Sequence, residues 1–202
     1  MNRRPLAEVA HITAGFAIAT AVSHDPDAGF QVLLPRHIGE EGGWFRYNDA
    51  EHATRMALPD RANRYLLQAG DVVVVARGER NRAALVVDCP YRTVASSAML
   101  VLRPRKELVV PEFLEWQLNQ VQAQAAIAQA RKGSTSPMVT ADDLGEVEIA
   151  VPDLATQRRV VQVVELVRAE QELLAKLAGA VRRRNRAVAC LLLTGRIQTT
   201  EI

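Results

Sequence analysis

The 202-residue sequence is poor in the features that mark several common classes of protein. Its two cysteines, Cys89 and Cys190, lie far apart and form no CxxC pair. This pattern argues against a disulfide framework or a thiolate zinc site and fits a reducing cytoplasm. Aromatic residues make up 4% of the chain, and its 11 glycines and 9 prolines are spread along it, which excludes collagen-like and low-complexity classes. No run reaches the ~18 to 20 uninterrupted apolar residues that a membrane helix needs. With 49% apolar residues, we predict a folded, cytoplasmic protein with one ordinary core and no membrane association.

Signatures of metal and nuclease sites are also missing. No two histidines are paired at i, i+4 and none stands beside a cysteine, which argues against a zinc site. The histidines are His11, His24, His37 and His52. A restriction-type nuclease usually needs a lysine two residues after an acidic residue, and none of the three lysines has that spacing. We therefore expect no metal and no nuclease activity.

One short motif resembles a catalytic box. Residues 88–91, Asp-Cys-Pro-Tyr, resemble the Asp-Pro-Pro-Tyr box of adenine-N6 methyltransferases, in which an extruded adenine stacks on the aromatic ring. The second position is cysteine, however, and no glycine-rich turn follows a strand to hold S-adenosylmethionine. We interpret the motif as a strand end followed by a turn, and we predict no catalytic residues and no cofactor on this chain.

The net charge of +2 conceals a difference between two parts of the chain. Residues 154–202 contain nine basic and four acidic residues, a net charge of +5, whereas residues 1–153 contain 16 basic and 19 acidic residues, a net charge of −3. Because phosphate contacts supply most non-specific affinity for nucleic acid, composition alone would not suggest DNA binding. Arginine provides 22 of the 25 basic residues, a bias that suits bidentate contacts with guanine or phosphate but that a GC-rich genome also produces.

Short aliphatic runs separated by Gly, Pro, Asp and Arg predict strands in the first part of the chain. They cover residues 31–35, 72–76, 83–87, 98–103 and 147–151. The second and third runs predict a hairpin with an arginine-rich tip. Pro111 and the apolar spacing after it predict one helix to about residue 130, followed by a loop over residues 132–137. The fold class is therefore α/β, in the mixed α+β sense, with a mixed sheet.

Residues 154–193 predict one long helix, because they contain no proline and a single glycine. A heptad repeat with its a position at Val160 makes every a residue apolar, while two of the five d residues, Glu170 and Arg184, are charged. Forty residues form a rod of about 60 Å, which needs a partner helix to cover its apolar stripe. The alternative is that the helix folds back on its own domain. The predicted dimerisation residues are Val160, Val163, Val167, Leu174, Leu177, Val181, Val188 and Leu191.

The order of several motifs resembles the specificity (S) subunits of Type I restriction-modification systems. Most telling is the segment from Leu144 through 147–152, Val-Glu-Ile-Ala-Val-Pro, to Gln157 and Arg158, which resembles the family's entry into a spacer helix. The other matching segments are residues 6–10 with Gly15, Leu67 with 70–72, Gly78, 95–97, 100–103, 111–114 and 132–134. The resemblance covers nearly the whole chain.

The resemblance implies a half-size form, since full-size members carry two target recognition domains and two spacer helices. We expect a target recognition domain at residues 1–153 and a spacer and dimerisation helix with a short tail at 154–202. A homodimer would read an interrupted palindrome on double-stranded DNA. The implied partners are a separate DNA adenine methyltransferase (M) subunit, which would carry S-adenosylmethionine, and possibly a restriction (R) subunit.

Two loops are the candidates for DNA contact. Arginines crowded on a hairpin tip suit guanine edges or phosphates, and a flexible glycine with short hydroxyls suits backbone contacts. The candidates are Arg77, Arg80 and Arg82 on the tip, and Lys132, Gly133, Ser134 and Thr135 on the later loop. Both loops could equally be ordinary surface. The arginines at 182–184 and 186 are open to two interpretations, a solvated helix end or a contact with DNA or an acidic partner.

Two other functions compete with DNA recognition. A structural or regulatory mimic of a specificity subunit would pair through its helix without reading DNA, and the negative charge of residues 1–153 favours it slightly. An autonomous methyltransferase is the third hypothesis, and it requires the isolated chain to transfer a methyl group.

Overall fold

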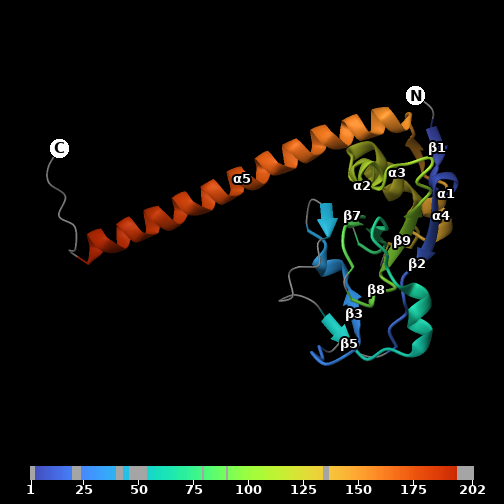
Figure 1. Ribbon diagram of the computed structural model, residues 1–202, viewed down its shortest axis with the longest axis horizontal. Coiled ribbons are helices and arrows are strands. Elements are labelled where there is room, and N and C mark those ends of the chain that lie inside the picture. Colours follow the sequence, from blue (N-terminus) through green and yellow to red (C-terminus); the bar gives the residue numbers. More distant parts are fainter. Residues whose placement is uncertain are drawn as a thin grey trace. The chain divides into compact units, whose positions relative to one another are not determined.

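The structure of the chain, a computed structural model, describes residues 3–19, 24–39, 43–45, 54–78, 80–89, 91–133 and 137–194 (Figure 1). It divides into two compact units, Met1–Val161 and Gln162–Ile202, called here the N-terminal unit and the C-terminal unit. The predicted mixed α+β class with a long C-terminal helix is confirmed. The predicted domain boundary at residue 153 lies eight residues before the end of the N-terminal unit.

A five-stranded sheet in the order β2-β9-β6-β7-β4 forms the centre of the N-terminal unit. Neighbouring strands are antiparallel except for β4, which runs parallel to β7 and makes the sheet mixed. The four valines of β6 are buried on both faces, as a continuous β-branched run predicts. The strands are β2 (Ala10–Ala14), β4 (Gly43–Phe45), β6 (Val72–Val75), β7 (Ala83–Val86) and β9 (Met99–Pro104).

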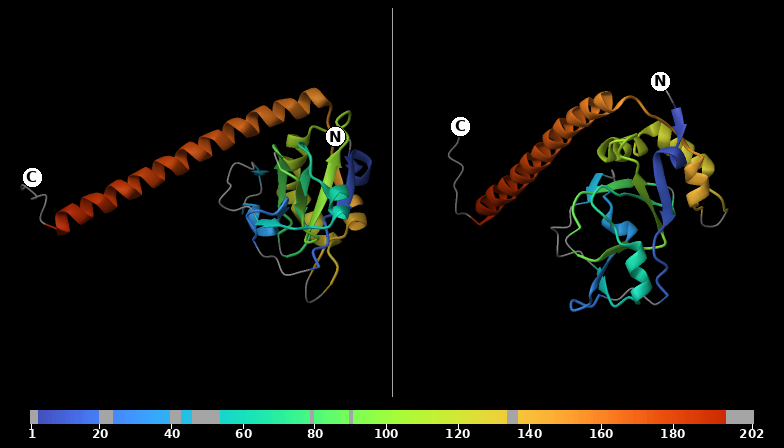
Figure 2. Two further views of the ribbon diagram at one scale, coloured as in Figure 1. Left: turned by 60° about the horizontal axis from the view of Figure 1, so that its bottom comes forward. Right: turned by 45° about the vertical axis from the view of Figure 1, so that its right-hand side comes forward.

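Two smaller sheets complete the strand framework. One has the order β5-β3-β8, with β3 antiparallel to β5 and parallel to β8. The other pairs the two ends of the N-terminal unit, since β1 lies antiparallel to β10. Their strands are β1 (Arg3–Pro5), β3 (Phe30–Leu33), β5 (Thr54–Met56), β8 (Thr93–Ala95) and β10 (Glu148–Ala150), and the 3-10 helices η1 (Pro35–His37) and η3 (Asp60–Tyr65) connect to the β5-β3-β8 sheet. Figure 1 and the right-hand view of Figure 2 show this sheet at the end of the unit away from α2 and α3.

Two helices stand where the sequence predicted one after Pro111. These are α2 (Pro111–Leu118) and α3 (Val121–Ala130). The helix breaks because the Asn119 side chain bonds to the backbone of Ala83 in β7, accepting from its N–H (3.0 Å) and donating to its carbonyl (3.0 Å). The prediction of a continuous helix was therefore wrong. Val121, the first residue of α3, is 84% exposed.

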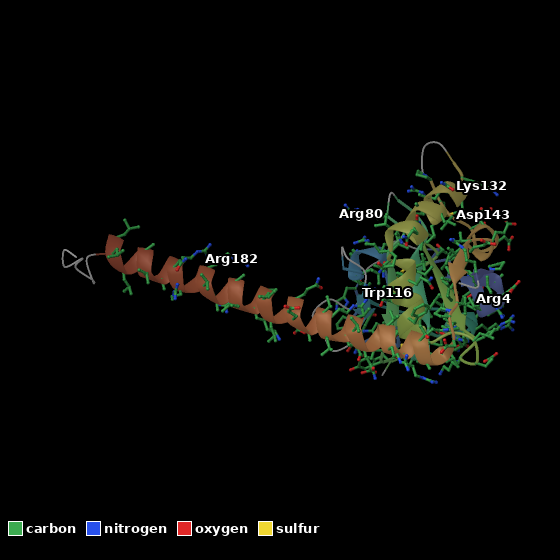
Figure 3. All side chains as sticks on the ribbon, turned by 90° about the horizontal axis from the view of Figure 1, so that it is seen from above. Arg4, Arg80, Trp116, Lys132, Asp143 and Arg182 are labelled. Carbon is green, nitrogen blue, oxygen red and sulfur yellow. The ribbon has the colours of Figure 1, made fainter. Side chains whose placement is uncertain are left out.

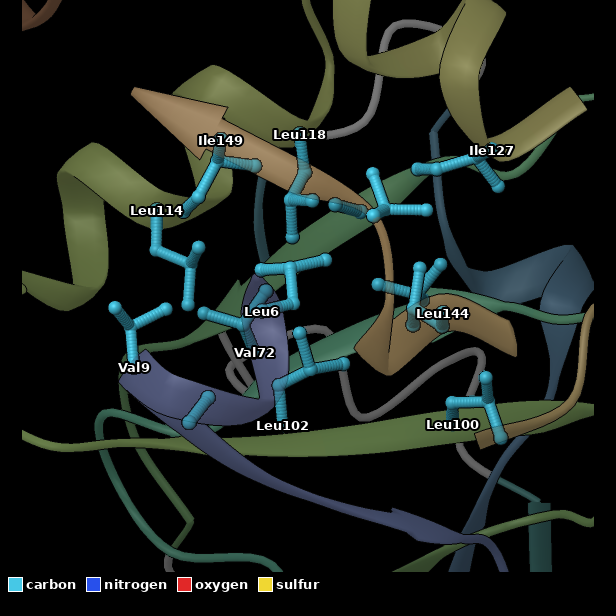
Figure 4. Close-up of a cluster of buried hydrophobic side chains, with 14 of the residues drawn as sticks. Leu6, Val9, Val72, Leu100, Leu102, Leu114, Leu118, Ile127, Leu144 and Ile149 are labelled. Atoms are coloured by element: carbon cyan, nitrogen blue, oxygen red, sulfur yellow. The ribbon is translucent and has the colours of Figure 1, made fainter. Parts of the chain in front are cut away.

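The main one of three hydrophobic clusters in the N-terminal unit lies between the five-stranded sheet and the short helices, which include α1 (Leu6–Val9) and α4 (Ala141–Gly145). Figure 4 shows Leu6, Leu102 and Leu114 meeting in this cluster, and each is fully buried. Burying one such side chain contributes about 1.5 to 3 kcal/mol, so the cluster outweighs any single polar contact in stabilising the unit.

Gly15 and Asp71, which belong to motifs of the family resemblance, have clear structural roles. A Cβ at Gly15 would lie 2.1 Å from the carbonyl oxygen of Ser96, so only glycine fits where the two chain segments meet. The buried Asp71 carboxylate accepts two hydrogen bonds from the Arg103 guanidinium (both 2.8 Å) and one from the backbone N–H of Gln68 (2.8 Å). This bidentate pair ties the start of β6 to β9.

The long helix α5 runs over 40 residues, Leu154–Leu193, as the sequence predicted. Asp153 caps it by accepting from the Thr156 N–H (2.9 Å) and hydroxyl (2.7 Å), and these hydrogen bonds lower the pKa of its carboxyl group. Within the first turns, the fully buried Gln157 accepts from the N–H of Val110 (2.8 Å) and donates to the carbonyls of Leu108 (3.0 Å) and Pro152 (2.7 Å). The start of α5 is therefore fastened to the segment that precedes α2.

Candidate nucleic-acid interface

The two loops predicted to contact DNA lie against each other in the structure. A β-bridge joins Arg77 to Met138, and Met138 also bridges to Lys132. The N–H of Gly78 donates to the carbonyl of Pro137 (3.3 Å). We call the surface formed by residues 76–78, 80–82, 131–133 and 137–139 the loop pair. Sequence reasoning selected each loop separately, and the structure makes them one surface.

Local backbone geometry explains the shape of the loop pair. Gly78 and Gly133 have φ angles of 106° and 99°, which residues with a Cβ rarely adopt. Behind the tip, the buried Asn81 donates to the carbonyl of Val75 (2.8 Å), while its own carbonyl accepts from the side chain of Gln124 (2.9 Å). These two hydrogen bonds fix the base of the tip on the end of β6.

The three tip arginines have different surroundings. Arg77 and Arg80 are exposed, so their guanidinium groups face solvent. Arg82 is half-buried, and its Nη1 donates to the carbonyls of Ile38 and Gly39 (both 3.1 Å). Two of the arginines are therefore exposed on the tip, whereas the third holds the tip against the segment after η1.

Lys132 is paired within the chain. Its Nζ lies 2.5 Å from Oδ1 of Asp143. The other carboxylate oxygen of Asp143, Oδ2, accepts a hydrogen bond from the Thr140 hydroxyl (2.7 Å). Figure 3 labels Lys132, Asp143 and Arg80. The hydrogen bond to Asp143 raises the pKa of Lys132, and the hydrogen bonds from Lys132 and Thr140 lower the pKa of Asp143. A phosphate would have to compete with this carboxylate for the ammonium group. Ser134 and Thr135 lie outside the described residues.

Sequence reasoning missed Arg131 in the loop pair. Its Nη1 donates to the carbonyl of Gly78 (2.9 Å), so the side chain reaches from one loop to the other. Its position directly before Lys132 was the available signal, but the predicted loop began one residue later.

A second basic surface lies on the β5-β3-β8 sheet and was also missed. The Arg55 guanidinium lies 4.9 Å from the centre of the Tyr91 ring, and Arg92 lies 4.2 Å from that of Phe30. The Arg92 side chain also bonds to Asn63 of η3, which brings η3 beside this group. We call the exposed or half-exposed members the arginine–tyrosine surface; they are Arg55, Arg61, Arg64, Tyr65, Tyr91 and Arg92. They come from three separate segments, so no local pattern could indicate them.

The aromatic residue of the methyltransferase-like motif lies at the surface. Tyr91 is 51% exposed, and the Arg55 guanidinium covers a face of its ring. Burial raises the pKa of the Cys89 thiol. Among the residues that the structure describes, no three His, Cys, Asp or Glu side chains gather in a way that could hold a metal ion.

In the C-terminal unit, α5 carries a stripe of exposed apolar side chains. Val163, Val167, Leu174, Leu177, Val181 and Val188 are exposed, and Leu191 is half-buried. Val160 lies in the N-terminal unit, where it packs against the core. Leu166 and Leu173, which the heptad placed at flanking g positions, are 72% and 66% exposed. The apolar stripe is therefore wider than the a and d positions alone.

The arginine cluster near the end of α5 is exposed at every position from Arg182 to Arg186, and Figure 3 shows Arg182 on the helix. Arg184 donates to the neighbouring Asn185 side chain (3.4 Å). No helix among the described residues combines the length and the apolar character that crossing a membrane requires.

Comparison with known proteins gives a consistent result. The family model described as Type I restriction modification DNA specificity domain matches residues 2–179. No curated protein matches the sequence.

Several solved structures are similar in fold. A Type I restriction-modification S subunit from M. genitalium has 14% identity and a TM-score of 0.62, over 96% of this chain and 46% of that one. An HsdS subunit from Thermoanaerobacter tengcongensis has 22% identity and a TM-score of 0.66, over 93% of this chain and 47% of that one. A chain from a study of complex assembly and conformational transition of the type I R-M system has 18% identity and a TM-score of 0.64, over 94% and 45%. The present chain thus spans less than half the length of these similar chains.

Proposed function

The chain belongs to the family of Type I restriction modification DNA specificity domains, and from this we propose that it is a half-size specificity subunit that recognises DNA without catalysing a reaction. The family predicted from the sequence motifs is confirmed. The coverage supports the half-size form, because almost the whole chain aligns with less than half of each similar solved chain.

The proposal of DNA recognition rests mainly on one observation, the contact between the two basic loops that form the loop pair. Arg77 and Arg80 are exposed on one loop, and Lys132 is exposed on the other, so their cationic groups can meet the same stretch of duplex. In this proposal the arginines contact base edges or phosphates, and Gly133 lets the backbone approach the DNA. Arg82 positions the tip, and the hydroxyls of Ser134 and Thr135 complete the contact set.

The arginine–tyrosine surface supplies a second contact in this proposal. Arginine and tyrosine suit nucleic acid because guanidinium groups bind phosphate and aromatic rings stack or donate a hydroxyl. The Tyr65 and Tyr91 rings are 43% and 51% exposed, so both can be reached by a ligand. Basic side chains are therefore concentrated on two surfaces, although residues 1–153 carry a net negative charge.

A homodimer through α5 completes the proposed subunit. Leu174 and Leu177 are 58% and 61% exposed on a stripe that continues over most of the helix, and large apolar patches of this kind mark interaction surfaces. A symmetric dimer would present two identical recognition domains to the DNA. Its site would be a palindrome interrupted by a spacer.

The proposed partner is a separate DNA adenine methyltransferase (M) subunit in the cytoplasm. That subunit would hold S-adenosylmethionine and flip an adenine out of each half-site, while this chain fixes the register of the duplex. The net charge of −3 on residues 1–153 predicts weak affinity for DNA by this chain alone, so the partner would close the complex around the duplex. A restriction (R) subunit is a further partner in systems that also cleave.

A regulatory mimic of a specificity subunit is the second candidate. It is favoured by the negative balance of residues 1–153 and by the pairing of Lys132 with Asp143, which occupies one of the basic groups of the loop pair. Such a protein would dimerise through α5 and join the methyltransferase without reading sequence.

Selection from random-sequence duplexes tests the proposal. The full chain is incubated with the duplex pool alone and together with the methyltransferase, and bound DNA is sequenced. We expect enrichment of an interrupted palindrome, strongest in the presence of the methyltransferase. Absence of enrichment in both arms, with a stable complex between the two proteins, would establish the regulatory mimic instead. Transfer of a labelled methyl group by the isolated chain would overturn the non-catalytic assignment.

A further inference from the structure

The net positive charge of α5 lies in the second half of the helix. Residues 154–172 contain three basic and three acidic residues, whereas residues 173–194 contain five basic residues and no acidic one. The five are Lys176, Arg182, Arg183, Arg184 and Arg186. Because residues 1–153 have a net charge of −3, the positive excess of the whole chain lies in this part of α5.

Four of these basic residues surround a glycine on one face of the helix. Gly179 is the single glycine of α5. Lys176 precedes it by three residues, and Arg182, Arg183 and Arg186 follow it by three, four and seven. Residues with these separations lie on the same face of an α-helix. We call these five residues the glycine-centred basic face.

The glycine-centred basic face is separate from the apolar stripe. Gly179 lies two residues from Leu177 and from Val181, and residues two apart on a helix do not face each other. In the heptad, the five residues of the face occupy b, c and f positions, which point away from a seam of a and d residues. The face therefore stays accessible when a second helix covers the stripe.

The arginines of this face are available to an anionic ligand. Arg182, Arg183 and Arg186 are exposed, and Figure 3 shows Arg182 on the helix. Lys176 is also exposed, but its Nζ lies 2.6 Å from Oε1 of Glu172, one turn earlier. The three arginines are therefore the main anion-binding groups of the face.

Gly179 is unfavourable for the helix in which it lies. A glycine inside a helix lowers stability relative to alanine, because it loses more backbone freedom on folding. Its missing side chain, however, lets a ligand approach the backbone closely. A Cβ at Gly179 would lie 3.4 Å from Nη1 of Arg183, so a guanidinium group borders the bare surface over the glycine.

We propose that the glycine-centred basic face binds the phosphate groups of double-stranded DNA without regard to sequence. The inference rests on the proposed function and adds a role for α5: the loop pair selects the sequence, and α5 supplies affinity for the DNA backbone. At about 1.5 Å per residue the face is about 15 Å long, and one strand of a duplex presents about four phosphates over that length. Such a contact suits the spacer of an interrupted site, where no base is read.

The composition of the face favours DNA over an acidic protein partner. Protein interfaces have an apolar centre with aromatic anchors inside a polar rim. The residues three and four away from Gly179 are Ala175, Lys176, Arg182 and Arg183, so no large apolar side chain lies at the centre of the face. Phosphate groups need only cations and close approach, and guanidinium groups bind them in bidentate fashion.

Removal of the arginines tests the contact. The face variant combines Arg182→Gln, Arg183→Gln and Arg186→Gln, which retain long polar side chains with good helix propensity. Binding of the full chain to a random-sequence duplex is measured between about 50 and 200 mM salt. We expect at least about tenfold weaker binding at the lower salt concentration. The slope of log K against log salt should become shallower by about two to three, because each phosphate contact contributes about 0.9.

A matched control removes the same charge elsewhere. Arg105→Gln, Arg158→Gln and Arg159→Gln together replace three exposed arginines outside the face, and binding should change by less than about threefold. Equal binding by the two triple variants would overturn the inference, as would a wild-type chain without measurable affinity for the duplex at about 50 mM salt. Wild-type DNA binding by the face variant, with loss of the methyltransferase complex or of self-association, would assign the face to a protein partner instead.

Substitution of the glycine separates access to the face from helix stability. Gly179→Ala and Gly179→Gln both raise helix propensity, so the helical circular dichroism signal of the full chain should persist to higher temperature in both. The alanine Cβ meets only the flexible end of Arg183, so we expect DNA binding within about twofold of the wild type. The glutamine side chain occupies the bare surface and should weaken binding at least about threefold despite the more stable helix. Equal binding by the two variants would overturn Gly179 as the centre of the contact.

Selection from random-sequence duplexes distinguishes this inference from the proposed function. The face variant should bind all duplexes more weakly by the same factor and still enrich the sequence that the wild type enriches, because the loop pair is unchanged. Enrichment by the wild type, with undiminished binding of random duplexes by the face variant, would overturn the inference and leave the proposed function intact. Weakened binding of random duplexes by the face variant, without enrichment by the wild type, would support the inference and count against sequence recognition.

Discussion

The two units of the chain use apolar residues in opposite ways. The N-terminal unit buries its leucines and valines against one another, as Leu102 and Val72 do in the main cluster, and ties its turns with buried polar contacts. The C-terminal unit is a single helix whose apolar stripe, including Leu174 and Leu177, is exposed in one copy of the chain. The first unit can be stable on its own residues. The second leaves its apolar stripe uncovered in a single copy, and this contrast makes each unit respond differently to substitution.

The largest expected effect comes from placing charges in the exposed stripe. Val167→Glu with Leu174→Glu would put four carboxylates at the seam of a dimer, where they cannot be paired. We expect a soluble monomer by sedimentation, at least 100-fold weaker in self-association, with the thermal unfolding of the N-terminal unit unchanged. Ala169→Glu with Ala175→Glu adds the same charge outside the a and d positions and should remain dimeric. A dimer of wild-type affinity in the first variant would show that the stripe is not the contact surface.

The next largest effect is expected inside the N-terminal unit. Gln157→Ala removes three hydrogen bonds and leaves the N–H of Val110 and the carbonyls of Leu108 and Pro152 without that partner. Buried groups left unpaired cost about 1 to 3 kcal/mol each, so we expect a loss of about 3 kcal/mol in the free energy of unfolding.

Denaturant unfolding of the full chain measures this loss, and Gln162→Ala, an exposed glutamine one helical turn and a half later, serves as the control. The control should change the free energy of unfolding by less than about 0.5 kcal/mol. If both variants unfolded alike, the ties made by Gln157 would not contribute to the stability of the N-terminal unit.

A contact within the loop pair should have a smaller and more selective effect. Arg80→Ala removes an exposed guanidinium from the tip without disturbing a buried contact. If Arg80 reads guanine, we expect a loss of about 1 to 3 kcal/mol at one base pair of the site, whereas a phosphate contact would weaken all sequences alike. Binding to a panel of single-base variants of the selected site distinguishes these outcomes. Arg105→Ala, an exposed arginine outside the loop pair, is the control. Wild-type binding by Arg80→Ala on every duplex would remove this residue from the interface.

Features that depend on neighbouring residues could be predicted from the sequence, whereas features that depend on contacts between distant residues could not. The hairpin of β6 and β7 and the helix α5 follow from neighbouring residues, namely two aliphatic runs and 40 residues without proline. The end of the predicted helix at α2 depends instead on Asn119 bonding to Ala83, 36 residues earlier. The pairing of β1 with β10 joins strands from opposite ends of the unit. Periodicity contains no information on either contact.

The candidate site, too, could be predicted only where it depends on neighbouring residues. The spacing of arginines predicted a basic hairpin tip, and Arg77 and Arg80 are exposed there. Nothing near Arg82 in the sequence indicated that it would bond to the carbonyls of Ile38 and Gly39. The arginine–tyrosine surface was missed because its residues come together only when β5, η3 and the segment before β8 assemble.

The smallest expected effect concerns the charge balance of the loop pair. Asp143→Asn removes the carboxylate that holds Lys132, so the ammonium group becomes available to a phosphate without a competing internal partner. We expect DNA affinity to rise by about threefold on all sequences and its dependence on salt to steepen, as one more phosphate contact predicts. Asp142→Asn removes an equal charge from the neighbouring position that makes no hydrogen bond to Lys132 and is the control.

The hydrogen bonds from Lys132 and Thr140 lower the pKa of Asp143 below its ordinary 3.8, so its carboxylate stays ionised as the pH falls until that lowered value is reached. The pair should therefore add no step to the affinity of the wild type between about pH 5 and 8. Equal affinities of Asp143→Asn and Asp142→Asn would place Lys132 outside the DNA contact.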